Sequence, residues 1–343
     1  RNCSIPACLC RNVPSGSIGR TGGKVNIQEL YVSAQGDREF REIADALEAA
    51  TRYADQEVII HIAPGTYRER LVVHQDNISM IGEDASTTRI TYSDGAFEVL
   101  ADGEKRGTFR TPSFFIDADH FYADNLTFCN EAGQGDIAGQ ALAVYADGDH
   151  LVFENCRFEG YQDTLFTAPL PKKEMQPGGF RGPKEFAPRK HGRHLYKNCY
   201  ISGNIDFIFG SATAYFESCE LFMRNRNAEV NGYVTAASTY EGQKYGYVFN
   251  HCHFTSDCPK NSAYLGRPWR NYAKVVILNS EIDGHIRPEG WHDWNKKDAW
   301  DTLYFAEYNN YGEGATPSER APFVTFLTDK EAAEYTQDKV LGF

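Results

Sequence analysis

The clearest pattern in the chain is a seven-residue unit that recurs six times with the same order of apolar and polar positions. The copies align without gaps at residues 122–128, 152–158, 195–201, 215–221, 248–254 and 276–282. Positions 2 and 7 are apolar or aromatic in every copy, and position 5 is Leu, Cys or Ser. Strand residues alternate between two faces, so positions 2 and 5 would point to opposite faces of one straight strand. Because both positions are mostly apolar, the pattern predicts a bend at position 4.

Position 4 carries residues that suit such a bend. It is Asn in four copies, with Ser218 and His251 in the other two. Asn tolerates the left-handed backbone conformation and hydrogen-bonds its own backbone, and stacked Asn side chains can bond to one another along an axis. The unit therefore predicts a short strand, a turn and a second short strand.

Successive copies start 20 to 43 residues apart, and the chain between them is rich in strand patterns and glycine turns. Repetition of this kind predicts an all-β fold, a right-handed parallel β-helix, in which each coil stacks on the one before. An ordinary β-sandwich with coincidental similarity is the alternative, and six aligned copies disfavour it. We expect one β-helix domain over residues 25–343.

Both ends of such a stack need covering. Residues 38–51 have the helical pattern, with Asp37 as the predicted N-cap. The apolar face of this helix would be formed by Phe40, Ile43, Ala44 and Leu47. Near the other end, Thr328 and Glu331 form a capping-box pattern before a short helix that ends around Gly342. Residues 1–24 are uninformative and are expected to be disordered, their three cysteines (Cys3, Cys8 and Cys10) included.

Two aspartates follow two of the repeat units at the same distance. Asp163 lies seven residues after Cys156, and Asp206 lies seven residues after Cys199. Residues 167–193 between them contain five prolines and no strand pattern, which predicts a loop rather than an extra coil. The two carboxylates should then stack on adjacent coils beside this loop, about 4.8 Å apart. Carboxylates this close titrate as a pair, and one pKa rises.

Equivalent stacking is expected for Cys199 and Cys219. A spacing of about 4.8 Å would permit a disulfide in an oxidising compartment.

Composition limits the partners of the protein. The 343 residues include 41% hydrophobic side chains, enough for a sizeable core, and the formal net charge is −12. This charge disfavours nucleic acid and anionic membranes as partners. A membrane span needs roughly 20 consecutive apolar residues, and the sequence has none.

Five short motifs include or flank the two aspartates: Gly65–Glu69 (GTYRE), Gly139–Val144 (GQALAV), Tyr161–Leu165 (YQDTL), Gly203–Gly210 (GNIDFIFG) and Leu265–Trp269 (LGRPW). In this order they resemble the motifs of the pectin methylesterase (pectinesterase) family, and the bacterial type is expected. The second has Leu and Ala where the family often has Val and Ala. The resemblance covers essentially the whole chain after the first 24 residues.

The resemblance implies a role for each matching residue. Asp206 would attack the methyl ester carbonyl, and Asp163 would protonate methanol and then activate water. Arg267 would pair with Asp206 and hold it ionised.

The resemblance implies roles for five further residues. Gln140 and Gln162 would stabilise the oxyanion. Trp269, Phe209 and Phe166 would face sugar rings, although Phe166 stands where many members have Tyr.

The resemblance implies methyl-esterified pectin or an oligogalacturonide as substrate, no cofactor and no metal, and we expect a monomer. His251 and His253 flank Cys252 on a strand and are not predicted to bind a metal. Secretion or a periplasmic location is expected, with a cytoplasmic location as the alternative because no signal peptide is visible. A β-helix polysaccharide hydrolase or lyase and a non-catalytic carbohydrate-binding solenoid remain as alternative functions.

Overall fold

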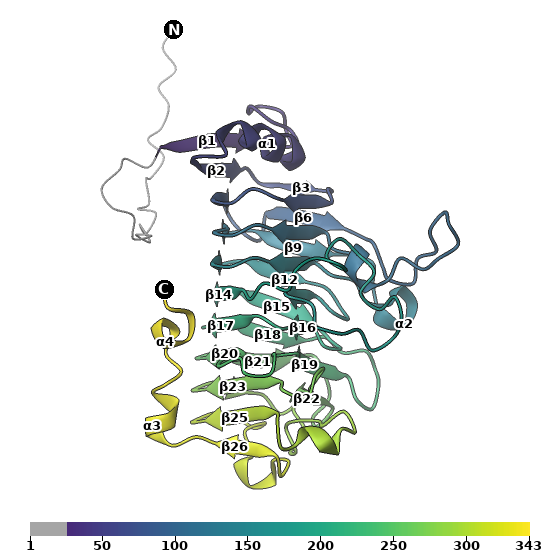
Figure 1. Cartoon of the computed structure of the whole chain (residues 1–343), viewed down its shortest axis with the longest axis vertical. Helices are drawn as coiled ribbons and strands as arrows, with labels where there is room; N and C mark the ends of the chain where they lie inside the picture. Colours follow the sequence, from purple (N-terminus) through teal and green to yellow (C-terminus); the bar gives the residue numbers. More distant parts are fainter. Residues whose placement is uncertain (1–25) are drawn as a thin grey trace.

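The computed structural model describes residues 26–343, in which short strands stack into three parallel sheets that run the length of the molecule (Figure 1). All the strand pairings between named strands of this part of the chain are parallel. The predicted right-handed parallel β-helix is therefore confirmed. The expectation for residues 1–24 lies outside the described residues.

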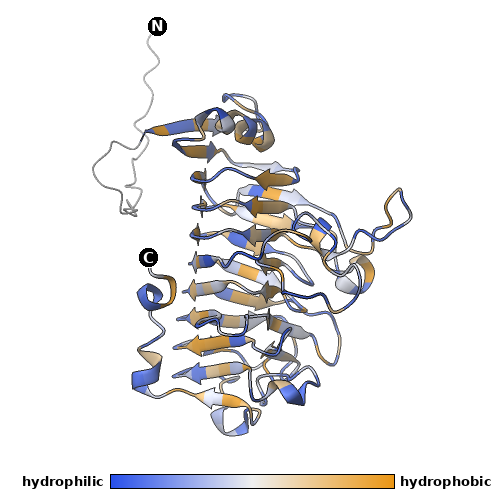
Figure 2. Cartoon of the chain, in the orientation of Figure 1, coloured by the Kyte–Doolittle hydropathy of each residue, from blue (hydrophilic) through white to orange (hydrophobic). Residues whose placement is uncertain are grey.

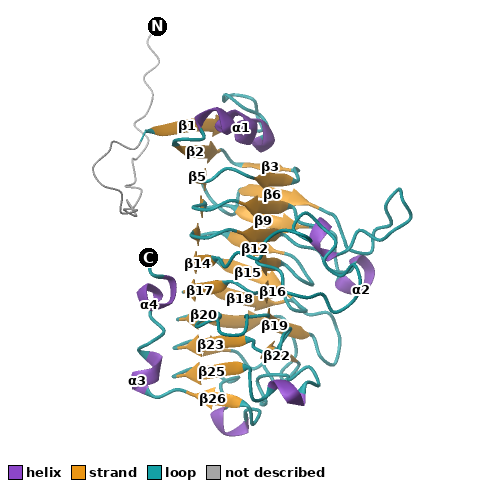
Figure 3. Ribbon diagram, in the orientation of Figure 1, coloured by secondary structure: helices purple, strands orange, loops and turns teal. Residues whose placement is uncertain are grey.

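Each sheet takes one strand from almost every coil (Figure 3). The largest sheet contains, in order, β1 (Ile27–Val32), β2 (Glu57–Ile62), β5 (Ile78–Gly82), β8 (Tyr122–Asp124), β11 (Leu151–Glu154), β14 (Arg193–Lys197), β17 (Thr213–Glu217), β20 (Tyr247–Asn250), β23 (Lys274–Leu278), β25 (Tyr304–Tyr308) and β26 (Val324–Phe326). The second sheet contains β3 (Gly65–Tyr67), β6 (Thr88–Tyr92), β9 (Thr127–Asn130), β12 (Arg157–Glu159), β15 (Tyr200–Gly203), β18 (Glu220–Met223), β21 (His253–Ser256) and β24 (Glu281–Ile282). The third contains β4 (Leu71–Val73), β7 (Phe114–Asp117), β10 (Val144–Asp147), β13 (Leu165–Thr167), β16 (Ile208–Gly210), β19 (Gly232–Ala237) and β22 (Ala263–Gly266).

The recurring unit forms the corner between the first two sheets. All six residues at position 4 have positive φ angles between 48° and 55°, so the predicted left-handed bend is present in every copy. The expected bonding along the axis is present in one pair, where Asn309 donates to Asn279 at 3.0 Å. Asn155 instead donates to Asp124 of the preceding coil at 2.8 Å.

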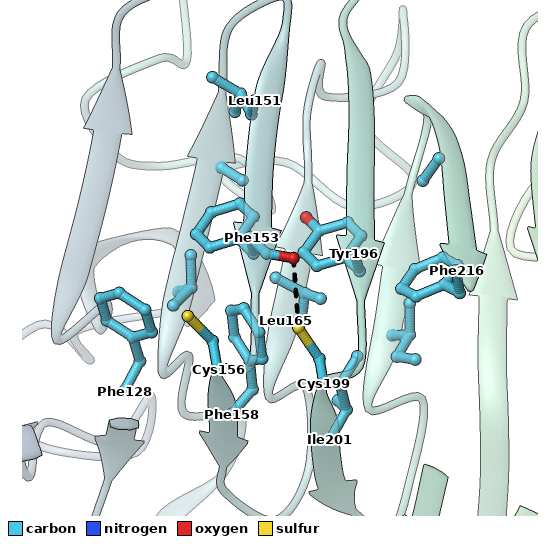
Figure 4. Packing of buried hydrophobic residues seen from close by; sticks show 14 of the residues in the cluster. Phe128, Leu151, Phe153, Cys156, Phe158, Leu165, Tyr196, Cys199, Ile201 and Phe216 are labelled. Atoms are coloured by element: carbon cyan, nitrogen blue, oxygen red, sulfur yellow. Dashed lines mark hydrogen bonds between the residues drawn. The ribbon is translucent and has the colours of Figure 1, made fainter. Parts of the chain in front are cut away.

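The apolar positions of the unit fill the interior. Position 2 gives a column of stacked rings (Figure 4). The ring centres of Phe153 and Tyr196 are 5.1 Å apart, those of Tyr196 and Phe216 are 4.7 Å apart, and the ring planes are nearly parallel. Their side chains are fully buried, and strand after strand along the stack carries hydrophobic residues (Figure 2). Stacked aromatic rings contribute beyond the burial of their area, by roughly 0.5–1.5 kcal/mol per pair.

The cysteine column lies beside these rings, and its thiols are free. Cys199 and Cys219 do occupy adjacent coils, but the disulfide that their stacking would permit is not formed. Instead, each thiol donates to a carbonyl oxygen of the preceding coil. Cys199 donates to Phe153 at 3.4 Å (Figure 4), and Cys219 donates to Tyr196 at 3.4 Å.

The helix at the N-terminal end differs from its prediction. Helix α1 (Ile43–Ala50) begins five residues later than expected, and the 3-10 helix η1 (Thr51–Tyr53) follows it. Its buried residues are Ile43, Ala46, Ala49 and Ala50, so the predicted inward-facing Ala44 is exposed. Asp37 does not cap the helix. The carboxylate of Glu69 accepts hydrogen bonds from the first two amides, at 2.9 and 2.8 Å, and so replaces a local cap.

The C-terminal residues form two helices rather than one. Helix α3 (Asp329–Ala332) begins with the predicted capping box, and α4 (Gln337–Leu341) ends at Gly342 in the left-handed conformation. They run along the outside of the largest sheet instead of covering the end of the stack (Figure 1). Val340 and Leu341 are buried there against a cluster that includes Leu195 and Tyr215. The remaining helices are α2 (Gly135–Ala138), η2 (Thr108–Arg110), η3 (Lys297–Ala299) and η4 (Pro317–Glu319). No helix in the described part is long and apolar enough to cross a membrane.

The bend provides a direct test of the corner. Asn198 has a φ of 53°, so Asn198→Ala should lower the free energy of unfolding by about 1–2 kcal/mol, because alanine lacks the short polar side chain that lets asparagine tolerate the left-handed region. Asn198→Gly should cost clearly less, since glycine adopts this region freely. Urea unfolding of the two variants measures the difference. Equal losses would show that the backbone conformation does not determine the choice of residue.

Candidate active site

Asp163 and Asp206 occupy equivalent positions on adjacent coils. Each aspartate lies two residues before a strand of the third sheet, Asp163 before Leu165 of β13 and Asp206 before Ile208 of β16. Leu165 and Ile208 are paired directly opposite each other, so the two aspartates are in register as well. The Asp163 amide donates to the Ile205 carbonyl at 3.0 Å. Both aspartates have left-handed φ angles, 63° and 51°, and are only 8% and 7% exposed. The shared bend therefore stacks two buried carboxylates in one register, at about the 4.8 Å spacing of parallel strands.

Arg267 is the main partner of Asp206. Its Nε and Nη2 atoms donate to the two carboxylate oxygens at 2.9 and 2.7 Å, a bidentate pairing. Arg267 follows β22, two coils beyond Asp206, and its own amide donates to the Thr235 carbonyl. The predicted pairing of these two side chains is thus formed by residues 61 positions apart.

The pairing makes the two carboxyl groups electrostatically different. Burial raises the pKa of Asp163 well above its usual range, the charge of Asp206 raises it further, and Arg267 only partly opposes the shift. Burial also raises the pKa of Asp206, but the charge and hydrogen bonds of Arg267 and the charge of Lys296 oppose this in part, so the pKa of Asp206 is raised less than that of Asp163. A proton shared by this pair consequently resides on Asp163, which leaves Asp206 as the ionised member.

Gln162 directly precedes Asp163 on the same coil, and Gln140 lies on the coil before it. The Ala141 amide, next to Gln140, donates to the Gln162 carbonyl at 3.2 Å, so the two glutamines belong to adjacent coils. Both are partly exposed. Gln162 packs against the start of α2: a Cβ on Gly135 would lie 2.3 Å from its Oε1 atom. Glycine at this position therefore permits the close approach of α2 to the site.

The predicted sugar-facing role of Phe166 is not compatible with its burial. Its side chain has 0% exposure and packs edge-on against Phe109 and Tyr145, at 5.0 and 4.7 Å between ring centres. The predicted loop between β13 and β14 contributes to this cluster through Phe180, which also packs on Phe109. Sequence alone did not reveal that this loop covers the outer face of the third sheet.

Trp269 and Phe209 are placed differently from Phe166. Trp269 is partly exposed, and its ring contacts Phe209 edge-on at 5.6 Å and the loop residue Phe180 at 6.4 Å. Phe209 keeps 3% exposure. Trp269 is therefore the predicted aromatic residue with a ring surface available to a ligand, and Phe209 supports it from below.

Asn204 supports the turn that carries Asp206, and it was not among the site residues predicted from the sequence. Asn204 is 1% exposed; its Oδ1 accepts from the Ile205 amide at 2.7 Å, and its Nδ2 donates to Gln134 at 2.8 Å. It fixes the turn that carries Asp206 and ties this turn to the residue before α2. Its position within the 203–210 motif is the sequence feature that could have pointed to it.

One group of described residues has the geometry to hold a metal ion, and it lies away from the aspartates. Ligand atoms of His253, Glu281 and Asp283 lie within 4.8 Å of one another on β21 and around β24. The ring of His253 is hydrogen-bonded to Asp283 at 3.0 Å, and each of the three side chains is more than 40% exposed. This arrangement is that of a surface ion-pair cluster. His251 instead pairs with Glu217 at 2.9 Å.

The raised pKa of Asp163 has a consequence for stability. In the unfolded chain this carboxyl ionises near its usual value of about 3.9. In the folded state it stays protonated to higher pH. Its contribution to stability is therefore present below pH ~3.9 and is lost as the pH rises toward the folded-state pKa.

We expect Asp163→Asn to remove this loss. The difference in Tm between the variant and the parent should be larger at pH 8 than at pH 4, by roughly 2 °C for each kcal/mol of stability gained. Thermal unfolding at both pH values measures it, with the exposed Asp301→Asn as control. A difference in Tm that does not change with pH would contradict the raised pKa.

The fold and much of the sequence are shared with solved pectin methylesterases. The structure is similar to pectin methylesterase from carrot, with a TM-score of 0.77 and 29% identity over 94% of each chain. It is equally related to pectin methylesterase PemA from Erwinia chrysanthemi, with a TM-score of 0.73 and 30% identity over 94% of this chain and 98% of that one.

Curated relatives give the same family. Pectinesterase 31 of Arabidopsis thaliana is 32% identical over 89% of this chain and 90% of its own length. A probable pectinesterase/pectinesterase inhibitor 23 of the same plant is 34% identical over 98% of this chain, which spans only 56% of that protein. These plant relatives do not support the expected bacterial type. The Pectinesterase family model matches residues 29–170 and 188–342, and the chain belongs to the pectinesterase family.

Proposed function

We propose that this chain removes methyl esters from galacturonate residues of pectin and releases methanol, with Asp206 as nucleophile and Asp163 as general acid and base. The observation that carries the proposal is the bidentate pairing of Arg267 with Asp206, beside a stacked second carboxylate. Solved relatives include a pectin methylesterase in complex with a hexasaccharide, 30% identical over 94% of this chain. We further propose that residues 25–343 act as one catalytic unit and as a monomer.

The reaction uses the difference between the two carboxyl groups. Asp206, held ionised by Arg267, attacks the ester carbonyl carbon and forms a tetrahedral intermediate. Asp163, the protonated member, donates its proton to the methoxy oxygen as the bond to methanol breaks. The resulting anhydride on Asp206 is hydrolysed by a water that Asp163, now ionised, deprotonates.

Gln140 and Gln162 are proposed to stabilise the oxyanion. Each has a side-chain amide that can donate two hydrogen bonds, and the two lie on adjacent coils next to Asp163. Removing one oxyanion donor typically costs about 3–4 kcal/mol of transition-state stabilisation. Trp269, partly exposed and two residues after Arg267, is proposed to stack on a sugar ring.

Neither alternative function accounts for the arrangement as well. A glycan hydrolase would use two carboxyl groups, but it gives no role to an arginine that holds one of them in a bidentate pairing. A non-catalytic carbohydrate-binding solenoid gives no role to a buried pair of carboxylates with a raised pKa. A polymeric substrate outside the cell would require export, so we propose a secreted or periplasmic location.

Substitution of the two aspartates tests the mechanism. Asp206→Asn and Asp163→Asn should each reduce methanol release from methylated pectin at least 100-fold, because Asn is neither a nucleophile nor an acid. The polymer length should stay unchanged in the parent reaction, which separates an esterase from a hydrolase or lyase. The exposed Asp301→Asn serves as control. Full methanol release by either variant would refute the assigned roles.

A further inference from the structure

The guanidinium of Arg267 lies between two aromatic rings. Its central carbon is 3.8 Å from the ring centre of Tyr233 and 3.6 Å from that of Trp294. Both distances are well inside the roughly 6 Å limit for cation–π contacts, which gain strength when the cation is removed from water. The Arg267 side chain is 15% exposed.

Tyr233 is held by the same parallel ladder as Asp206. It lies on β19, and its amide donates to the Asn204 carbonyl at 3.1 Å. Its ring stacks on Tyr264 of the next coil, with 5.5 Å between centres and 8° between planes. One side of the guanidinium is therefore bounded by a rigid, stacked pair of rings.

The ring on the other side comes from a loop in an unusual conformation. Trp294 and Asn295 have consecutive left-handed φ angles of 55° and 57°. For a bulky residue such as tryptophan this conformation is a genuine outlier, and it persists only where surrounding contacts impose it. The Trp294 amide donates to the His292 ring at 2.9 Å, and the Asn295 amide donates to the Asp293 carboxylate at 2.8 Å.

The loop is also tied to the motif that contains Arg267. Nζ of Lys296 donates to the carbonyls of Pro268 and Trp269 at 2.9 and 3.0 Å. Lys296 thereby joins residues 291–297 to the backbone directly after Arg267. It adds a positive charge near Asp206, and burial, followed by the charge of Arg270, lowers its own pKa to about 8.

We propose that Tyr233 and Trp294, secured by Lys296, form an aromatic clamp that positions Arg267 for its bidentate contact with Asp206. The inference rests on the proposed function, because it assigns these residues to the orientation of the nucleophile. They are positioning residues: the clamp acts on the reaction through Arg267. Without it, the planar guanidinium could rotate about its side-chain bonds and lose one of the two hydrogen bonds. The interaction that keeps Asp206 ionised would then be weaker.

The clamp predicts a displaced pH profile in Trp294→Leu. The acidic limb of kcat/KM for methanol release should move up by roughly half a pH unit or more, and kcat should fall about tenfold with a smaller change in KM. Trp294→Phe keeps a smaller ring and should be intermediate. Tyr233→Leu should move the limb in the same direction, whereas Tyr233→Phe, which keeps the ring, should not.

The matched control removes the same kind of contact elsewhere. Arg157 lies 4.0 Å above the ring of Tyr200 on the outside of the second sheet, so Tyr200→Leu should leave the pH profile unchanged. In the Arg267→Leu background, Trp294→Leu should change kcat/KM by less than about twofold, because the group on which the clamp acts is absent.

The outcomes separate the clamp from the proposed mechanism. If Asp206→Asn remained active, the mechanism itself would be wrong. If Asp206→Asn were inactive while Trp294→Leu left the acidic limb in place, or lowered activity equally with and without Arg267, only the clamp would be refuted. Circular dichroism and the Tm of each variant establish that it is folded, and Trp294→Phe with Tyr233→Leu decide the question if Trp294→Leu does not fold.

Discussion

In-register stacking of parallel coils is the constraint on which the rest of the structure depends. Each coil repeats the same left-handed bend, and hydrogen bonds between coils prevent a residue from sliding relative to its counterpart. A shift by one residue would exchange the inner and outer faces of every strand. Because the register is fixed in this way, Asp163 and Asp206 are held side by side although a loop separates them in sequence. The burial that stabilises the stack also removes water from both carboxyl groups.

Close stacking of like charges would by itself destabilise the site, and the arginine changes that balance. A bidentate guanidinium favours the ionised form of Asp206, while Asp163 has no comparable partner and keeps the raised pKa that burial and its neighbour impose. A single cation placed on one side therefore makes two identical residues electrostatically different, which is the difference that the proposed nucleophile and acid require. The aromatic contacts on Arg267 are the physical means by which this asymmetry could be kept constant during turnover.

Features encoded within one coil could be predicted from the sequence itself. Of the features that join separate coils, the pairing of Arg267 with Asp206 was predicted only through the family resemblance, whereas the cap of α1, the burial of Phe166 and the contacts of Trp294 were not predicted. The bends, the buried columns and the aspartate register follow from a short repeat and from a proline-rich loop. The cap of α1 comes from Glu69, which is 26 residues from Ile43, so the local choice of Asp37 was wrong. Phe166 is buried by a loop whose path no periodicity describes. Contacts of Trp294 with Arg267 depend on a loop of the next coil, 27 residues further along the chain, and the sequence carries no local signal for them.

The central claim is that a single proton resides on Asp163 while Asp206 is ionised. Difference infrared spectroscopy of the parent protein against Asp163→Asn, recorded over a pH series, observes that proton directly through the stretching band of a protonated carboxyl group. The account predicts a band that persists well above the usual range of aspartate, about pH 4, and that is absent from Asp163→Asn but shifted to still higher pH in Arg267→Leu. Loss of the band in the ordinary range of an exposed aspartate, or its persistence in Asp163→Asn, would contradict the account.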